Sequence, residues 1–402
     1  MRAATNELLF QSSDEQSRFF GHLARAMGGL GDRLKADNTC VAYALVGRGK
    51  NILRAPKDLF PNHELISSTN FQNIIIAIDY SNEGPPYKHS FIHALEEIKK
   101  LFEGKNLAFI YAQNNLQFKA DFFADSHSSR FYCAFPTYQI TTVRLLENLA
   151  SKKWVNVARR LLDRAPSRNF LCLNRKPRVH RLLALLWLAD NFDENTYRAT
   201  FGGFGGAMRA WTRHAETEAK AFLDSSEFDD VLERVRLHGF DPLTVPNNNM
   251  RRLVDDIDYK LYEETFASLV TESEMSDGKV IRYTEKMLKP LAAGHPAIVL
   301  GNPHTLPILE QMGFDFLRDE IDQSYDAVED PKQRLEMALR SARRLSDLPQ
   351  PAWDEFLQRN RSRLAANIQR FDGSLLRDLL VGWELELKHC ILDLTRRLSG
   401  RA

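Results

Sequence analysis

Asn73–Asp79 has the sequence NIIIAID, and this stretch gives the first indication of the fold. It is an unbroken apolar run of strand length that ends at an acidic residue. A strand with one face in water alternates apolar and polar residues, whereas a continuous run is typical of a parallel strand covered on both faces. AIVL, residues 297–300, is a second run of this kind. Both segments favour the α/β class.

Alternating segments extend outward from NIIIAID. The first half predicts helices at residues 15–27, 89–102 and 141–149, and strands at residues 41–46, 73–79, 107–111 and 131–135. After a basic stretch at residues 158–168 the alternation restarts with a strand at 170–173 (FLCL) and a helix at 181–190. Such alternation predicts doubly wound parallel sheets.

The restart divides the chain into domains. We expect a Rossmann-like α/β domain at residues 1–165 and a second one at residues 166–330. Residues 331–402 have the apolar spacing of amphipathic helices. We expect this helical C-terminal tail to pack back on both domains.

Composition excludes several classes of protein. The 402 residues carry 54 basic and 53 acidic side chains, so no global field attracts nucleic acid or an anionic membrane. The four cysteines are widely separated without a CxxC pair, which gives a zinc or disulfide framework no support. The opening residues MRAATNELLFQSSDEQ lack a signal pattern, and no apolar stretch approaches the about 20 residues of a transmembrane helix. We therefore expect a cytoplasmic protein.

Residues 266–303, FASLVTESEMSDGKVIRYTEKMLKPLAAGHPAIVLGNP, are the most informative for function. They predict a buried strand, an acidic loop, a helix that starts near YTEK, and a second buried strand before GNP. Thr284 is a good N-cap, so Glu285 and Lys286 fall in the first helical turn, beside free backbone N–H groups. Such a turn can bind a phosphate through those donors and the Lys286 ammonium, while Glu285 can accept hydrogen bonds from ribose hydroxyls.

This stretch resembles the nucleotide-sugar glycosyltransferases of GT-B architecture, most closely the donor domain of the α1,3-fucosyltransferase family. That family has a strand, a Glu-Asn-Ser-like turn, an acidic-glycine loop, Tyr-x-Thr-Glu-Lys opening a helix, and a strand ending in Gly. The same order is matched here by Phe266, Glu272, Ser273, Asp277, Gly278, Tyr283, Thr284, Glu285, Lys286 and Gly301. The turn TES at residues 271–273 departs from Glu-Asn-Ser, so the resemblance bears on donor-nucleotide binding far more than on fucose.

The resemblance implies two facing Rossmann-like domains, with the donor nucleotide on the second. It extends to the end of strand 170–173, where the family has a turn followed by an arginine that contacts the donor diphosphate. The counterpart of that arginine is Arg181 or Arg178. The implied donor-binding residues are Asn174, Arg178, Arg181, Glu272, Tyr283, Thr284, Glu285, Lys286, Gly301 and Asn302. No cofactor or metal is implied, because lysine, arginine and a helix N-terminus can stabilise a leaving diphosphate.

A GT-B acceptor domain supplies the catalytic base, which the resemblance assigns to residues 1–165. Our candidates are Asp79, Glu83 and His89, at the end of one predicted strand, in its loop and at the start of the next helix. An ordinary capping or surface role stays open for each. Inverting transfer needs one base near the acceptor hydroxyl, while a retaining route needs a carboxylate nucleophile, and both stay open.

The expected function is sugar transfer from a nucleotide-sugar donor to a saccharide or glycan acceptor, as in bacterial-type surface polysaccharide synthesis. A lipid-linked acceptor would bring the protein to the inner face of a membrane. The alternatives are a non-catalytic nucleotide- or glycan-binding protein of the same fold, and a structural partner protein that associates through its tail. We interpret Asp255, Asp256 and Asp258 as a solvated face rather than a metal site. The basic run RKPRVHR, residues 175–181, lacks the interleaved aromatics of a nucleic-acid patch.

Overall fold

The structure is a computed structural model, and it divides the chain into two compact units. Unit 1 comprises Met1–Ile140 with Arg377–Ala402, and unit 2 comprises Thr141–Leu376. The residues that the structure describes are 8–11, 18–46, 59–60, 63–80, 85–137, 139–174, 176–202, 218–240 and 256–400.

Unit 1 contains a parallel five-stranded sheet. Its strands follow one another across the sheet in chain order: β1 (Leu9–Gln11), β2 (Thr39–Leu45), β3 (Asn73–Asp79), β4 (Asn106–Ala112) and β5 (Tyr132–Ala134). NIIIAID forms the central strand β3 and is buried along its whole length. The continuous apolar run is explained by helices on both faces of the sheet.

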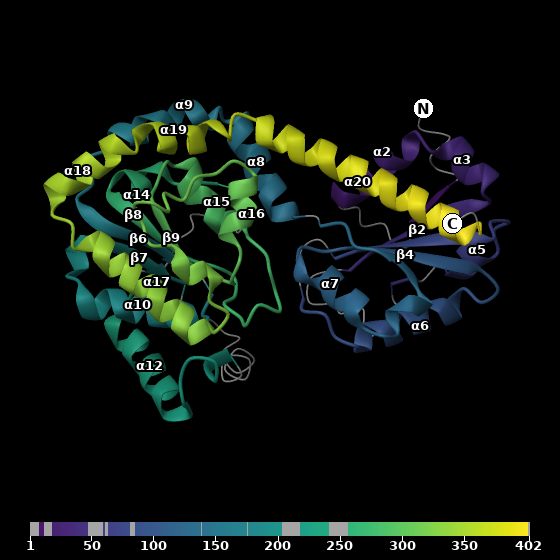
Figure 1. Ribbon diagram of the computed structural model, residues 1–402, viewed down its shortest axis with the longest axis horizontal. Helices are drawn as coiled ribbons and strands as arrows, with labels where there is room; N and C mark the ends of the chain where they lie inside the picture. The colour runs from purple at the N-terminus through teal and green to yellow at the C-terminus, as the bar shows by residue number, and fades with distance from the viewer. Residues whose placement is uncertain are drawn as a thin grey trace. The chain divides into compact units, whose positions relative to one another are not determined.

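Two groups of helices cover this sheet, with α6 and α7 on one side and α2 and α20 on the other (Figure 1). The helices of unit 1 are α2 (Arg18–Gly28), α3 (Gly31–Ala36), α5 (His63–Ser67), α6 (Ser90–Leu101), α7 (Gln117–Ala124), the 3-10 helix η1 (Ser128–Arg130) and α20 (Ser374–Leu398). Ile74, Ile76 and Ile78 of β3 share one hydrophobic core with residues of α5, α6 and α7. On the other side, His22 of α2 lies 3.1 Å from the Glu384 carboxylate of α20.

Unit 2 contains a parallel four-stranded sheet of order β7-β6-β8-β9. The strands are β6 (Arg168–Asn174), β7 (Tyr197–Phe201), β8 (Thr265–Thr271) and β9 (Ala297–Leu300). After β7 the chain returns to the other side of β6, so the strand order reverses between β6 and β8. Open α/β sheets bind ligands at such a switch point, outside the carboxyl ends of the strands. The expected α/β class with two parallel sheets is confirmed.

Helices surround the second sheet and form most of the C-terminal region (Figure 1). They are α8 (Ile140–Ser151), α9 (Trp154–Ala158), η2 (Arg159–Asp163), α10 (Val179–Asn191), η3 (Glu194–Thr196), α12 (Ser225–His238), α14 (Tyr259–Glu263), α15 (Glu285–Ala292), α16 (Leu306–Gln311), η5 (Ser324–Ala327), α17 (Pro331–Ser346), α18 (Gln350–Arg359) and α19 (Arg361–Gln369).

Residues 141–165, which the sequence assigned to the first domain, belong to unit 2. The Trp154 indole donates a 2.8 Å hydrogen bond to the carbonyl of Ala292. The buried Arg164 guanidinium donates to the carbonyls of Thr265, Phe266 and Gly294 at 3.1–3.3 Å. These long-range bonds attach the segment to the second sheet, and its sequence alone carries no sign of them.

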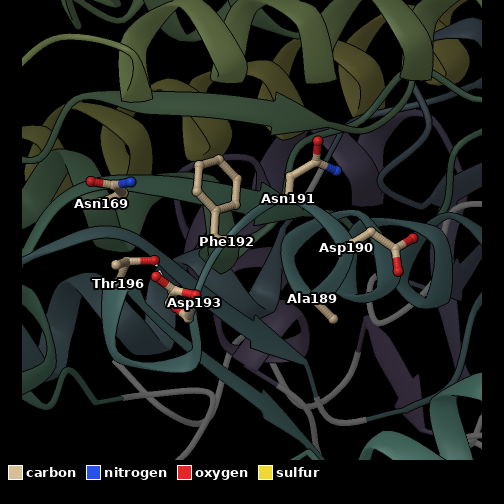
Figure 2. A pocket seen from close by; sticks show the side chains of 7 residues that line it. All are labelled: Asn169, Ala189, Asp190, Asn191, Phe192, Asp193 and Thr196. Carbon is tan, nitrogen blue, oxygen red and sulfur yellow. Dashed lines mark hydrogen bonds between the residues drawn. The ribbon is translucent and has the colours of Figure 1, made fainter.

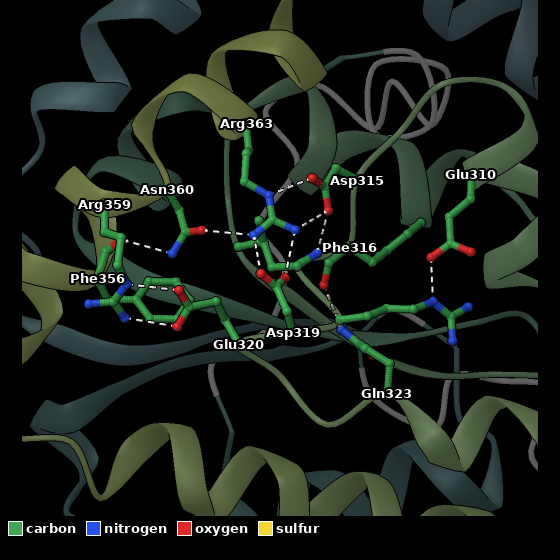
Figure 3. Close-up of polar contacts among 12 residues, drawn as sticks. Glu310, Asp315, Phe316, Asp319, Glu320, Gln323, Phe356, Arg359, Asn360 and Arg363 are labelled. Carbon is green, nitrogen blue, oxygen red and sulfur yellow. Dashed lines mark hydrogen bonds and ion pairs between the residues drawn. The ribbon is translucent and has the colours of Figure 1, made fainter.

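The predicted helical tail is divided between the units. Residues 331–376 belong to unit 2, where charged side chains of α18 and α19 bind the segment after α16 (Figure 3). Arg363 makes a two-pronged contact with Asp315, at 2.6 and 2.9 Å, and Arg359 makes one with Glu320, at 2.8 Å for both bonds. Residues 377–402, most of α20, belong to unit 1.

Two sequence expectations concern the membrane and the cysteines. None of the helices in the described residues combines the length and apolar character needed to span a membrane. The described residues include all four cysteines, and none of these forms a disulfide. Burial raises the pKa of the Cys40 and Cys172 thiols to about 12, so both stay protonated and unreactive at neutral pH.

Candidate functional site

The predicted donor-binding residues gather at the carboxyl edge of the second sheet. Asn174 ends β6, while Glu272 and Gly301 directly follow β8 and β9. Thr284 caps α15, the helix between β8 and β9. Residues far apart in the chain therefore meet at the switch point between β6 and β8.

Glu272 holds this edge together. Its carboxylate accepts hydrogen bonds from the backbone N–H and the hydroxyl of Thr284, at 3.1 and 2.7 Å, and from the Ser273 N–H at 2.9 Å. The residue is 3% exposed. A buried carboxylate with three donors is fixed in position. Glu272 therefore fixes the start of α15 to the end of β8, rather than offering a free carboxylate.

Lys286 lies in the first turn of α15, as the sequence predicted. Its ammonium group is 2.8 Å from the Glu285 carboxylate and 3.3 Å from the Ser273 hydroxyl, and 30% of the side chain is exposed. Burial acts to raise the pKa of Glu285, but the charges of Lys286 and Lys289 outweigh it and lower the pKa. Glu285 is therefore ionised at neutral pH and holds the lysine at the start of the helix.

Arg181 and Arg178, the two candidates for a phosphate contact, have different surroundings. The buried Arg181 guanidinium donates to the carbonyls of Glu272 and Lys176, with distances of 2.6–3.1 Å. Burial and the nearby Arg178 lower the pKa of Arg181 to about 10, so it keeps its charge at neutral pH. Arg178 at the start of α10 is 30% exposed. Arg178 is therefore the more accessible of the two cations.

A carboxylate already occupies the start of α10. Glu218 accepts a 3.4 Å hydrogen bond from the Val179 N–H and lies 3.9 Å from Arg178. A helix N-terminus favours an anion at this position. Glu218 therefore occupies the Val179 N–H and lies near Arg178, the two donors that a phosphate at this helix start would use.

Asn174, Asn302 and Tyr283 shape the loops of this edge. Asn174 accepts a hydrogen bond from the Thr271 hydroxyl and joins the ends of β6 and β8. The Asn302 side chain accepts from the N–H and hydroxyl of Ser276, at 2.7 and 3.0 Å. Tyr283 is buried, and burial raises its pKa. These three side chains help to shape the loops, and none of them presents an exposed charge.

Glycine is needed at position 301 because a side chain there would crowd Glu272, and not because the backbone is left-handed. A Cβ at this position would lie 3.1 Å from both Cβ and Cγ of Glu272. We expect Gly301→Ala to push Glu272 out of place and to lower the free energy of unfolding by about 1–3 kcal/mol, the usual cost of overpacking. Urea denaturation measures this change. Gly382→Ala is the matched control, because among the described residues nothing lies within 4 Å of its added Cβ; an equal loss in both variants would contradict the explanation.

Arg334 of α17 is a site residue that the sequence analysis missed. Its guanidinium donates to the Gly301 carbonyl at 2.9 Å, the Glu329 carbonyl at 2.9 Å and the Ser276 carbonyl. It is 1% exposed, and burial lowers its pKa to about 10, so it stays charged. Arg334 fixes the loops after β8 and β9 to each other. The sequence of α17 contains four other basic residues, and nothing in the sequence distinguishes Arg334 from them.

The three candidates for a catalytic base lie in unit 1. Asp79, at the end of β3, is fully buried, and its carboxylate accepts a 2.9 Å hydrogen bond from the Tyr43 hydroxyl. Glu83 lies outside the described residues. The half-exposed His89 imidazole is 2.6 Å from the Asp125 carboxylate. Asp79 and His89 therefore bind different partners.

The acidic cluster near residue 256 has structural partners. Asp256 forms a 2.7 Å ion pair with Lys152, and Asp258 caps α14 by accepting from the Lys260 N–H at 3.2 Å. Asp255 lies outside the described residues. Both described carboxylates take part in ordinary surface and capping contacts.

A pocket of about 390 Å³ lies at the opposite end of β6 (Figure 2). It is lined by Asn169, Ala189, Asp190, Asn191, Phe192, Asp193 and Thr196. These residues come from the amino end of β6, the last turn of α10 and the segment that follows α10. Asp190 is paired with Arg234, and the Thr196 hydroxyl donates to the Asp193 carbonyl at 2.7 Å. We assign no ligand to this pocket, because open α/β sheets bind ligands at the other edge.

Comparison with known proteins identifies no family for this chain. No protein-family model matches the chain, and no curated protein matches it.

Proposed function

We propose that unit 2 binds the nucleotide part of a nucleotide-sugar and that the protein is a glycosyltransferase. The supporting observation is that the first turn of α15, with the partly exposed Lys286, and the start of α10, preceded by Arg178, both lie at the carboxyl edge of a parallel sheet beside its switch point. Two helix starts and two cations at one sheet edge suit a diphosphate. The acceptor in this proposal is a saccharide or glycan, including a lipid-linked one.

The proposed reaction needs charge stabilisation more than any other contribution. The acceptor hydroxyl oxygen bonds to the anomeric carbon, the bond from that carbon to the diphosphate breaks, and the hydroxyl proton passes to a base. Negative charge develops on the leaving diphosphate. Donors that are already in position stabilise such charge at low cost. Lys286 and Arg178 supply the positive charge here, and Glu272 and Arg334 hold the loops at this edge of the sheet.

Glu218 offers a direct test of where phosphate binds. If phosphate takes the donors of Val179 and Arg178, it competes with the Glu218 carboxylate for them. Glu218→Gln removes the like charge, and we expect nucleoside diphosphate to bind about two- to fivefold tighter, which corresponds to about 0.4–1 kcal/mol. Calorimetric titration measures the change, with Glu233→Gln on the exposed side of α12 as control. Weaker binding by Glu218→Gln would instead indicate that Glu218 itself contacts the nucleotide.

A second candidate function is nucleotide binding without transfer. The observation that favours it is that one candidate base, Asp79, is fully buried with its carboxylate hydrogen-bonded to the Tyr43 hydroxyl. Incubation with nucleotide-sugars of uridine, guanosine, cytidine and adenosine separates the two functions. A transferase releases the nucleotide faster when the matching acceptor is added. A binding protein holds the nucleotide-sugar intact at any acceptor concentration.

A further inference from the structure

A second cluster of functional groups lies in unit 1, between the start of α6 and the segment that joins α7 to η1. His89 precedes α6, while Asp125 and His127 follow α7. The imidazole Nδ1 atoms approach the two carboxylate oxygens separately: Nδ1 of His89 is 2.6 Å from Oδ2, and Nδ1 of His127 is 3.3 Å from Oδ1. The His89 and His127 rings lie 5.0 Å apart at a steep angle.

These three side chains present donor atoms to one small volume. One ligand atom from each lies within 4.8 Å of the other two. Zinc bonds of about 2.0–2.2 Å in a tetrahedron put neighbouring ligand atoms about 3.3 Å apart. The two histidines are about half exposed, with side-chain exposures of 51% and 43%, so their rings have room to rotate toward an ion.

We propose that His89, Asp125 and His127 bind a divalent transition-metal ion, with Zn²⁺ as the best-fitting ion. Two neutral imidazoles and one carboxylate are a donor set that zinc accepts, and three protein ligands leave the fourth position to water or substrate. Mg²⁺ and Ca²⁺ prefer a shell of oxygen atoms, which two histidines do not supply. The proposal is independent of nucleotide binding, because it uses none of the residues of unit 2.

The carboxylate is held in place before an ion arrives. Asp125 accepts hydrogen bonds from the Tyr87 hydroxyl at 2.7 Å and from the His127 backbone N–H at 2.9 Å. The His89 imidazole is a further partner of this carboxylate, at 2.6 Å. Hydrogen bonds that orient a ligand commonly raise metal affinity by about 10–100-fold. Tyr87 and the turn after Asp125 supply them here.

His93 provides a matched control in the same helix. Its ring lies 5.4 Å from the ring of His89, but its Nδ1 is 3.4 Å from the Glu96 carboxylate. Glu96 also contacts Arg130 at 3.4 Å, so this carboxylate already has two partners. The proposed ligand set excludes His93. Replacing His93 therefore changes the surface and the number of histidines without removing a proposed ligand.

Calorimetric titration of the full chain with Zn²⁺, followed by Co²⁺ spectroscopy, tests the proposal. The protein is used without a histidine tag. We expect one bound ion per chain, visible absorption from tetrahedral Co²⁺, and no sulfur-to-metal absorption, because thiols are not ligands. His127→Ala and Asp125→Asn are expected to weaken Zn²⁺ binding by at least about 10-fold. His93→Ala is expected to bind as the wild type does.

Three results would overturn the assignment. They are the absence of stoichiometric Zn²⁺ binding to the wild type, equal binding by the wild type and His127→Ala, and a loss with His93→Ala as large as that with His127→Ala. Circular dichroism of each variant separates loss of a ligand from loss of the fold. If Asp125→Asn unfolds unit 1, His89→Ala replaces it, because the exposed His89 ring lies outside the hydrophobic core.

Discussion

Lys286→Ala is expected to lower the turnover of the proposed transfer by about 100- to 1000-fold, the usual loss when one donor to a developing charge is removed. Lys286 is partly exposed and lies in the first turn of α15. Its main contact is the neighbouring Glu285 carboxylate, so the fold does not depend on it. The midpoint of thermal unfolding should stay close to that of the wild type. Release of nucleotide from the donor measures turnover.

Lys279→Ala is the matched control for this prediction. Lys279 lies in the loop that precedes α15, but 70% of its side chain is exposed and it is paired with Asp277. Its removal should leave turnover within about twofold, since exposed ion pairs contribute little. Equal turnover by Lys286→Ala and the wild type would show that the start of α15 does not stabilise the leaving group.

Arg334→Ala is expected to lower the free energy of unfolding by about 3–5 kcal/mol, because breaking a buried charged network leaves several partners unpaired. The carbonyls of Gly301, Ser276 and Glu329 would lose their donor in a buried place. Urea denaturation of the full chain measures the loss. Arg340→Ala on the exposed side of the same helix is the control and should change stability by less than about 0.5 kcal/mol.

Arg334→Lys separates charge from geometry. Lysine keeps the positive charge but replaces the flat fork of donors with a single ammonium group. We expect it to recover less than half of the lost stability, because one ammonium cannot reach three carbonyls that lie in different directions. Full recovery would mean that the positive charge matters at this position and the fork does not.

The strands were predictable because their signals are local. NIIIAID forms β3 with the bounds that the apolar run suggested, and AIVL forms β9. The N-cap was predictable for the same reason, since Thr284 and the first turn of α15 depend on consecutive residues. The sequence also placed Glu285 and Lys286 in that turn.

The remaining features depend on contacts between distant residues. The strand order that produces the switch point follows from β8 pairing with β6, about 100 residues earlier in the chain. The role of Glu272 depends on Thr284, and that of Arg334 on carbonyls that lie 33 and 58 residues before it in the chain. The spacing of apolar residues along the sequence does not show which distant residues will pair. The sequence therefore showed which charges are present, and the structure showed which are already bound to other groups.

The cluster around Asp125 illustrates the same limit. The sequence analysis named His89 as a candidate catalytic base and did not name Asp125 or His127, because 36 positions separate His89 from Asp125. The three side chains meet only when α7 packs beside α6. Their convergence is a property of the fold.

Thermal denaturation with UDP, GDP, CMP and ADP, each with and without magnesium, is the most direct test of nucleotide binding by unit 2. A ligand at 100 times its dissociation constant adds about 2.7 kcal/mol of stability, which raises the unfolding midpoint by about 5–10 °C for a unit of this size. We predict such a rise with one nucleotide, unchanged without magnesium and lost in Lys286→Ala. An unchanged midpoint with all four nucleotides, at concentrations up to the millimolar range, would contradict the proposed nucleotide site.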